Sequence, residues 1–190
     1  MRFLIDIAIA IAIAVVVGIA SAWYAIDRGM PFGAVVLGDW TTWPGVGSAT
    51  ADPYSLATLA RTGEVPLGAG EGIAFSADAD HDGEPLVGTC SYRLVGQTPP
   101  GRLWTLTAYD GEGRLMVNPA RRQGFHSREI VRKPDGSFEI IASTEVAAGN
   151  WLPLGRTDRF RLVFRLYDTP LTTGSMAEAT MPQILRDSCS

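Results

Sequence analysis

The chain opens with an almost unbroken apolar segment, Phe3–Ile26. As a helix rising about 1.5 Å per residue, this segment would span roughly 36 Å, which exceeds a bilayer hydrocarbon core of about 30 Å. Asp6 is the only charged side chain within it. Trp23 and Tyr24 lie near its far end, where amphipathic rings favour the headgroup region. The segment therefore predicts an N-terminal transmembrane anchor over residues 1–26, ahead of whatever else the chain folds into.

The fate of this anchor depends on the region that ends at Ala22. Ala20-Ser21-Ala22 fits the small-x-small pattern of a signal-peptidase site. The apolar stretch is longer than the roughly 7–15 residues of a signal-peptide core, however, and a very short leader precedes it. We therefore expect an uncleaved anchor, with cleavage after Ala22 as the alternative. A lone N-terminal anchor followed by one domain favours export, so we expect a single-pass protein of the cell membrane with its C-terminal domain in the periplasm or otherwise outside the cytoplasm.

The rest of the chain has the composition of one soluble domain. The whole 190-residue sequence is 46% hydrophobic, and without the anchor that share falls to about 40%, slightly below a globular average. The formal net charge of -4 argues against a nucleic-acid partner, because such surfaces are basic. A glycine-rich segment, residues 27–50, contains Trp40 and Trp43 and predicts an irregular connector. Residues 51–190 are then the folded domain.

Local signals within this domain predict one helix and several strands. Asp52-Pro53 supplies an N-cap and a proline at the first helical position, so we expect a short helix over 53–62 that ends before Gly63. From Gly72 onward, apolar runs separated by Gly, Pro and Asp predict strands. These runs are 73–76, 85–94, 102–109, 115–118, 127–132, 138–143 and 159–167. Because no helical segments separate them, the expected fold class is mainly β, an antiparallel β-sandwich or jelly-roll-like domain.

The chain has two cysteines, Cys90 within a predicted strand and Cys189 next to the C-terminus. In an oxidising compartment they are a plausible disulfide, which would hold a short ordered segment of the tail against the sheet. The alternative is a buried thiol at Cys90 and a disordered tail at Cys189.

Motifs for metal or cofactor chemistry are incomplete. Asp78-x-Asp80-x-Asp82-Gly83 matches the first half of a calcium loop, but position twelve is Thr89 where a glutamate is required. An acidic hairpin tip is the favoured interpretation. With two histidines and no His-Glu-x-x-His motif, a zinc site has little support. We expect neither a metal nor another cofactor.

A set of planar polar groups and aromatic side chains on irregular segments forms the best candidate for a binding site, because binding residues concentrate on such segments. The candidate ligand-binding residues are Asp110, Asn118, Arg121, His126, Asn150, Trp151 and Arg165. The competing interpretation is that these side chains hydrogen-bond loop backbone and hold long connections in place.

Several motifs in register resemble the bacterial domain-of-unknown-function family 1214. They are Trp104–Asp110, Asn118–Arg122, Pro134–Ser137, Asn150–Pro153 and Arg165–Tyr167. Further motifs upstream resemble the short, single-anchor version of that family: Ala51–Tyr54, Asp82–Leu86 and Cys90–Leu94. The resemblance implies a jelly-roll-like sandwich, often the C-terminal half of larger proteins that carry a companion 1254 domain, which we expect to be absent here. It implies no established reaction or ligand, so it assigns no catalytic residue.

Two functions fit these observations. The first is a membrane-anchored bacterial envelope protein whose β-sandwich is a non-catalytic ligand-binding or structural module, with an unidentified ligand or protein partner. The alternative is an envelope enzyme that acts on a glycan or another envelope polymer, with Asp110, Arg121, His126 and Arg165 near its pocket. An enzyme would bring at least two titratable groups into one concave site, which separates the two hypotheses.

Overall fold

The computed structural model describes residues 2–27, 29–30, 32–97, 99–172, 176 and 179–189. The chain divides into two compact units. The first unit comprises Met1–Ala34 and Gly45–Pro66, and the second comprises Val35–Pro44 and Leu67–Ser190. The chain therefore enters the second unit briefly, returns to the first, and only then completes the second.

The first unit contains two helices, α1 (Arg2–Asp27) and α2 (Pro53–Thr62). No described residue of α1 is buried, and its length and composition would allow it to cross a membrane. Helix α2 has the predicted bounds, and it is capped at both ends by the residues that predicted them. The Asp52 carboxylate accepts hydrogen bonds from the first free backbone N–H groups, and Gly63, with φ 72°, adopts the left-handed conformation that ends the helix.

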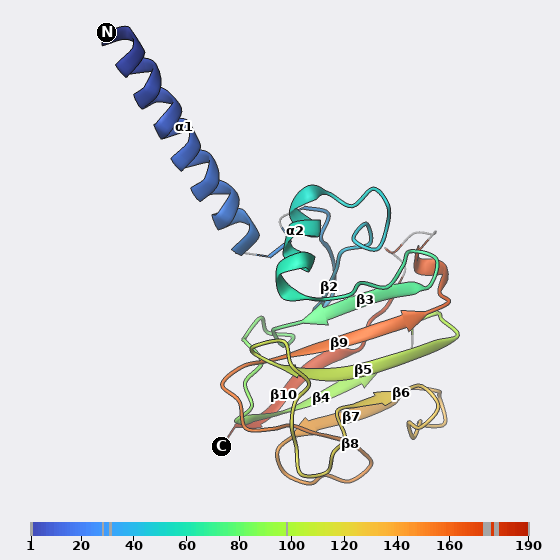
Figure 1. Ribbon diagram of the computed structural model, residues 1–190. Coiled ribbons are helices and arrows are strands. Elements are labelled where there is room, and N and C mark those ends of the chain that lie inside the picture. The colour runs from blue at the N-terminus through green and yellow to red at the C-terminus, as the bar shows by residue number, and fades with distance from the viewer. Residues whose placement is uncertain are drawn as a thin grey trace. The chain divides into compact units, whose positions relative to one another are not determined.

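The second unit is built from two sheets (Figure 1). The six-stranded sheet has the order β1-β2-β3-β9-β5-β6, and the four-stranded sheet has the order β10-β4-β7-β8. The strands of the first sheet are β1 (Val35–Leu37), β2 (Trp40–Thr42), β3 (Gly72–Ala77), β9 (Phe160–Tyr167), β5 (Leu103–Asp110) and β6 (Gly124–His126). Those of the second are β10 (Gln183–Cys189), β4 (Cys90–Gly96), β7 (Phe138–Ser143) and β8 (Asn150–Pro153). A 3-10 turn, η1 (Pro170–Thr172), follows β9.

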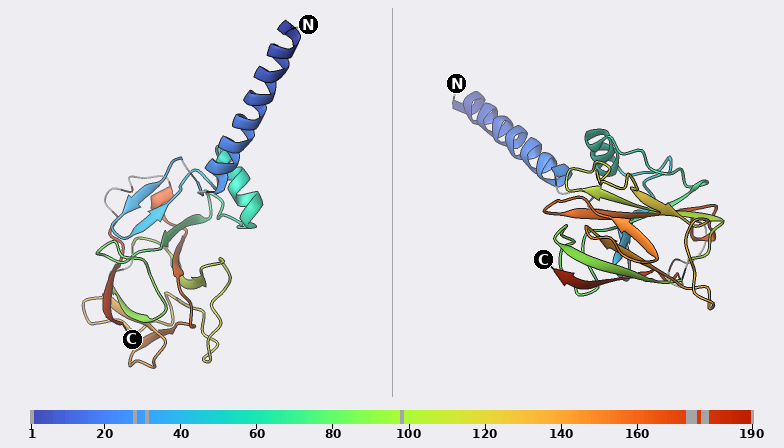
Figure 2. Two further views of the ribbon diagram at one scale, coloured as in Figure 1. Left: turned by 90° about the vertical axis from the view of Figure 1, so that its left-hand side faces the viewer. Right: turned by 90° about the horizontal axis from the view of Figure 1, so that it is seen from below.

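The two sheets lie face to face, and their inner faces share one hydrophobic core (Figure 2). Alternate residues of each strand point inward, as strand geometry requires. The Trp104 ring of β5 stacks on Phe164 of β9 with centroids 4.9 Å apart. The same ring lies 5.3 Å from that of Phe138, on β7 of the opposite sheet. These contacts confirm the predicted mainly-β sandwich, in which neighbouring strands run antiparallel except for β7 and β8, which are parallel.

The segment expected to be an irregular connector, residues 27–50, instead contains the β1–β2 hairpin. Gly38, with φ 59°, allows the tight reversal between the two strands. Trp40 is 0% exposed, and its indole N–H donates to the carbonyl of Pro182 at 2.7 Å. Strands of three residues are too short to show an alternating pattern, so the sequence did not reveal them.

Two predicted strands, 115–118 and 127–132, are absent. Only isolated bridges occur there, at Leu115 and Arg132. Between them lies β6, whose three residues are too few to show alternation in the sequence. A third predicted strand, 85–94, begins as regular β4 only at Cys90. Before it, the chain at Gly88 lies close to the backbone of Thr157, and the Gly88 N–H donates to the Thr157 carbonyl at 3.0 Å.

Candidate functional site

The candidate ligand-binding residues fall into three separate parts of the sandwich. His126 and Arg165 lie on the outer face of the six-stranded sheet. Asp110 lies at the end of β5, and Asn118 and Arg121 lie in the loop that follows. The remaining two, Asn150 and Trp151, are on β8 in the other sheet.

Asn118 and Asn150 are buried, and each uses its amide to hold a loop. The amide of Asn118 donates to the carbonyl of Arg122 at 2.7 Å and accepts the N–H of the same residue at 3.1 Å. Asn150 donates to the carbonyls of Val131 and Glu139, both at 2.8 Å, and accepts the N–H of Val131 at 2.8 Å. These hydrogen bonds match the competing interpretation, in which such side chains satisfy backbone groups that no strand pairs.

Asp110 stabilises the hairpin turn at the end of β5. Its carboxylate accepts the backbone N–H groups of Glu112 and Arg114, each at 2.9 Å, and the Arg114 guanidinium at 3.1 Å. These bonds, above all the one from the Arg114 backbone, lower the pKa of Asp110 from its ordinary value. A carboxylate that is held ionised in this way is a poor proton donor.

His126 and Arg165 share one row across the outer face of the six-stranded sheet, because both pair with Thr105 of β5. The Arg165 guanidinium also lies 5.6 Å from the centre of the Tyr109 ring. Asp110 is five positions further along β5, a separation of roughly 16 Å at about 3.3 Å per residue, and strand alternation places it on the opposite face. The register therefore does not bring Asp110 and His126 into one site.

A shallow hollow of about 300 Å³ lies at β7 and β8. The hollow is lined by Val131, Arg132, Lys133, Glu139, Ile141, Ala148, Gly149 and Asn150. Trp151 pairs in register with Ile141, so the two side chains share the outer face of the sheet. The indole N–H of Trp151 donates to the carbonyl and hydroxyl oxygens of Ser143 at 3.2 Å, which fixes the orientation of the ring.

A row of alternating charges crosses the same face of the four-stranded sheet. Lys133 lies 3.1 Å from Glu139, and Arg93 lies 3.7 Å from Glu139 and 3.5 Å from Asp187. These side chains keep 30–57% of their surface exposed. The hollow thus combines apolar walls with both signs of charge, which suits a small amphiphilic group.

A second hollow, of about 540 Å³, is lined entirely by α1, from Val15 to Asp27. Most of its lining is apolar. In a helix that is able to cross a membrane, such a surface faces lipid, so this hollow is not a candidate for a water-soluble ligand.

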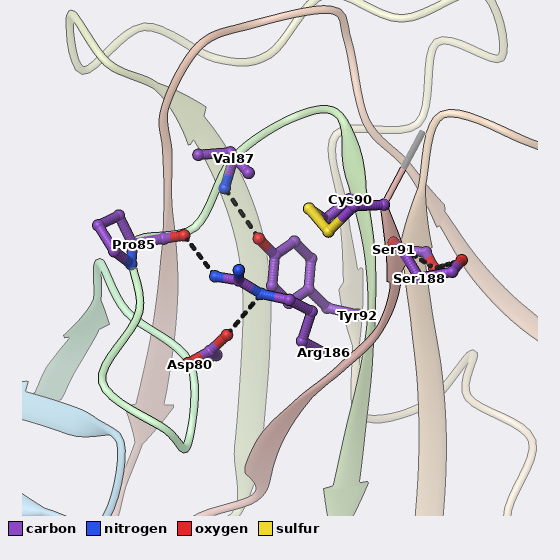
Figure 3. Close-up of a disulfide and its surroundings, with 9 residues drawn as sticks. Asp80, Pro85, Val87, Cys90, Ser91, Tyr92, Arg186 and Ser188 are labelled. Carbon is purple, nitrogen blue, oxygen red and sulfur yellow. Dashed lines mark hydrogen bonds and ion pairs between the residues drawn. A yellow bond between two sulfur atoms is a disulfide. The ribbon is translucent and has the colours of Figure 1, made fainter.

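A buried polar cluster lies beside the disulfide that joins Cys90 to Cys189 (Figure 3). The Asp80 carboxylate, 1% exposed, forms an ion pair of 2.8 Å with Arg186 of β10. The Arg186 guanidinium donates to the carbonyl of Pro85 at 2.9 Å and lies 5.7 Å from the centre of the Tyr92 ring. The C-terminal strand is therefore held to the sandwich by the covalent bond and by this ion pair.

A neighbouring pair, Asp39 and His81, contacts the same strand. The Asp39 carboxylate accepts the N–H of Ile184 at 2.7 Å, and its other oxygen lies 2.9 Å from Nδ1 of His81. This hydrogen bond, together with the negative charge of Asp39, raises the pKa of His81 above its ordinary value.

The acidic motif around Asp80 does not form a cation site. One oxygen of Asp80 accepts the backbone N–H groups of Asp82 and Glu84, and the other faces Arg186. The carboxylate therefore stabilises the hairpin tip that the sequence favoured. Within the part of the chain that the structure describes, no group of three His, Cys, Asp or Glu side chains could hold a metal ion.

Asp39 and Arg186 are partners in these contacts that no sequence motif indicated. Asp80 and Arg186 stand more than a hundred positions apart, and no local spacing relates them. The available signal was the cysteine pair, because a disulfide at Cys189 brings the preceding residues of the tail against the sheet.

Known proteins match the β-sandwich of this chain, and their descriptions give no activity. A family model described as "Protein of unknown function (DUF1214)" matches residues 71–171, which extend from β3 to η1. The crystal structure of the VPA0106 protein from Vibrio parahaemolyticus is 25% identical with a TM-score of 0.58, and the match covers 73% of this chain and 36% of that one. A putative uncharacterized protein from Burkholderia cenocepacia is 18% identical with a TM-score of 0.41, over 88% of this chain and 48% of that one. This chain thus spans about a third of the length of the first structure and about half of the second. No curated protein matches it significantly.

Proposed function

Since this chain belongs to the DUF1214 family, whose description assigns no function, we propose a role from its own residues. It is a membrane-anchored bacterial envelope protein. Helix α1 is retained as the anchor, the β-sandwich lies on the oxidising side of the membrane, and the sandwich is a non-catalytic module that binds a ligand or a partner.

The disulfide between Cys90 and Cys189 carries the proposed location. Structural disulfides persist in oxidising compartments and are rare in the cytosol. The chain that contains this bond also begins with a helix that is able to cross a membrane. A single anchor with an exported domain satisfies both observations.

A fusion of alkaline phosphatase after Ser190 tests this location, because the phosphatase is active only where disulfides form. We expect the full-length fusion to be active and to remain in the membrane fraction after alkaline extraction. The matched control is the same fusion without residues 2–27, which should be inactive. A full-length fusion that is made, sits in the membrane and is inactive would place the sandwich in the cytoplasm.

The non-catalytic role is supported by how the candidate polar side chains are used. Asn118 and Asn150 hold loop backbone, and Asp110 stabilises a turn. The enzyme alternative gains no support from this geometry, because it requires Asp110 and His126 in one concave site, and their positions on β5 and β6 separate them.

The hollow at β7 and β8 is the surface that best supports binding. Its volume of about 300 Å³ is at the lower end of the range for small-molecule sites. Val131, Ile141 and Ala148 supply an apolar wall that suits contact with a nonpolar group. Lys133 and Glu139 supply charged hydrogen-bonding groups at the rim.

Blocking the hollow tests this assignment. Envelope glycans, short peptides and headgroup analogues are screened by thermal shift on the full chain in detergent. We expect Ala148→Trp, which fills the hollow, to abolish the stabilisation by any hit. Val117→Trp, at an exposed loop position outside the hollow, is the control and should leave it unchanged. If a hit stabilised both variants equally, its binding site would lie outside this hollow.

A further inference from the structure

Strand β10 is held at Ile184 by contacts from outside its own sheet. The N–H of Ile184 donates to the Asp39 carboxylate at 2.7 Å, and its carbonyl accepts the N–H of His81 at 2.8 Å. The Ile184 side chain is 0% exposed and belongs to the core. Both backbone polar groups of this residue therefore use partners that β4, its neighbour in the sheet, does not supply.

These two partners also contact each other. Asp39 lies between β1 and β2, and His81 lies in the hairpin tip that follows β3. One carboxylate oxygen of Asp39 is 2.9 Å from Nδ1 of His81, and the other accepts the Ile184 N–H. The Asp39 side chain is 5% exposed, whereas that of His81 is 49% exposed. A nearly buried carboxylate thus joins a turn, a hairpin tip and the C-terminal strand, and its imidazole partner remains open to protons from the solvent.

The charged groups around His81 favour its protonated form. The hydrogen bond to Asp39, and then the negative charge of Asp39, raise the pKa of His81 above its ordinary value. The charges of Asp82 and Asp80 act in the same direction, and desolvation opposes them. Arg186 of β10, which also reaches this hairpin tip, forms its ion pair with Asp80 at 2.8 Å (Figure 3).

Loss of the proton from His81 weakens this contact without removing it. A neutral imidazole can still donate from Nδ1, but the hydrogen bond then lacks the attraction between opposite charges. Because the pKa of His81 is raised in the folded chain, the added stabilisation is complete below the ordinary value of 6.5. It is lost as the pH rises through the higher pKa of the folded chain. The attachment of β10 is therefore stronger in mildly acidic solution than in alkaline solution.

The position of β10 in the sandwich suits local opening. The strand lies at one edge of the four-stranded sheet, and a bulge between Arg186 and Ser188 interrupts its register. The disulfide between Cys189 and Cys90 keeps the end of the strand attached when the residues before it separate. Opening would therefore be confined and reversible.

We propose that Asp39 and His81 form a pH-sensitive clamp on β10, which holds the strand firmly when the imidazole is protonated and less firmly when it is neutral. Opening of β10 leaves the backbone edge of β4 unpaired, and an unpaired edge is able to pair with another strand. The pH of the surrounding solution thus regulates how often this edge is uncovered.

Hydrogen exchange of the full chain in detergent, followed by mass spectrometry between about pH 5.5 and pH 8.5, tests the clamp. Labelling times are scaled for the intrinsic dependence of amide exchange on pH. The readout is the protection of residues 183–189, and the amides of β5 are the internal reference. His81→Gln removes the titrating group at a half-exposed position. The matched control is His126→Gln, because His126 is the second of the two histidines and lies on β6 in the other sheet.

We expect the open fraction of β10 to rise about two- to fivefold from the acidic to the alkaline end, the range that a partly exposed ion pair permits. The unmodified chain and His126→Gln should both show this rise, with β5 unchanged, and His81→Gln should not. A rise that persists in His81→Gln, or that appears equally in β5, would overturn the inference.

A titration of the histidine ring signals by NMR is the second measurement. The His81 signals are identified by their absence from the spectrum of His81→Gln. We expect the pKa of His81 to lie above its ordinary value of 6.5. A pKa at or below that value would also overturn the inference, because the charge of Asp39 would then not act on the imidazole.

Discussion

Asp80 is a buried carboxylate whose charge is balanced by Arg186 on the last strand. Breaking a buried ion pair by removing one partner leaves the other charge uncompensated, at a cost of about 3–5 kcal/mol. Arg186 keeps 28% of its side chain exposed, so the lower end of that range applies. We expect Arg186→Leu to lower the free energy of unfolding by about 3 kcal/mol, which corresponds to roughly 6–12 °C in Tm for a domain of this size. Thermal melting of the full chain in detergent, followed by circular dichroism, measures the change.

An exposed pair of the same type is the control for this prediction. Arg102 and Asp168 lie 3.0 Å apart, with 74% and 71% of their side chains exposed. Exposed ion pairs contribute about 0–1 kcal/mol, so Arg102→Leu should leave the Tm nearly unchanged. Equal losses in the two variants would show that the burial of Asp80 does not set the strength of its pair.

At the level of elements, the disulfide joins the last residue of β10 to the first residue of β4. Strand β10 pairs with β4 at one edge of the four-stranded sheet, and a bulge between Arg186 and Ser188 interrupts its register. In the chain-entropy model, a crosslink that closes a loop of about 100 residues stabilises the fold by about 4–5 kcal/mol. We expect Cys189→Ser, at an exposed position, to increase hydrogen exchange in residues 183–189 first. The amides of β5, which lies inside the other sheet, serve as the internal reference. Uniform loss of protection across both strands would mean that β10 does not open on its own.

Sequence patterns predicted the elements that carry their own local signals. Helix α2 has a cap and a proline at its start, and β3, β5, β7 and β9 have runs long enough to predict strands. The hairpin β1–β2 has three residues per strand, too few for alternation to show. Strand β8 has only four residues, again too few for alternation to show. Strand β10 pairs with β4, which lies far away in the chain, and a pairing of this type leaves no trace in a short window of sequence.

The same limit applies to the candidate site. The sequence indicated Asn118 and Asn150 because an amide between strand-like runs is typical of loops, and both do hold loops. It could not indicate the hollow at β7 and β8, because that surface depends on which strands are neighbours. Its lining residues Ile141 and Asn150 come together only through the parallel pairing of these two strands.

At the scale of the whole molecule, the sandwich begins before α2 and not after it. The division of the chain places Val35–Pro44 in the second unit, although Gly45–Pro66 belongs to the first. Trp40 is the reason: its ring lies 5.8 Å from that of Phe164 in the core, and its N–H satisfies the carbonyl of Pro182. A domain boundary at residue 51 therefore leaves out Trp40, one of the largest side chains of the core.

Two shortened chains test this boundary, one beginning at Ala34 and the other at Ala51, so that both lack α1 and both keep α2. Loss of a buried tryptophan costs about 3–5 kcal/mol, and the loss of β2 leaves β3 as an unpaired edge strand, which favours aggregation. Loss of Asp39 also removes the acceptor for the N–H of Ile184, which weakens the attachment of β10. We expect the chain from Ala34 to elute as a monomer and melt cooperatively, and the chain from Ala51 to aggregate or to melt at least 10 °C lower, roughly as such a loss requires. Because the two differ only in residues 34–50, equal melting temperatures and equal elution would mean that the hairpin merely covers a sandwich that is complete without it.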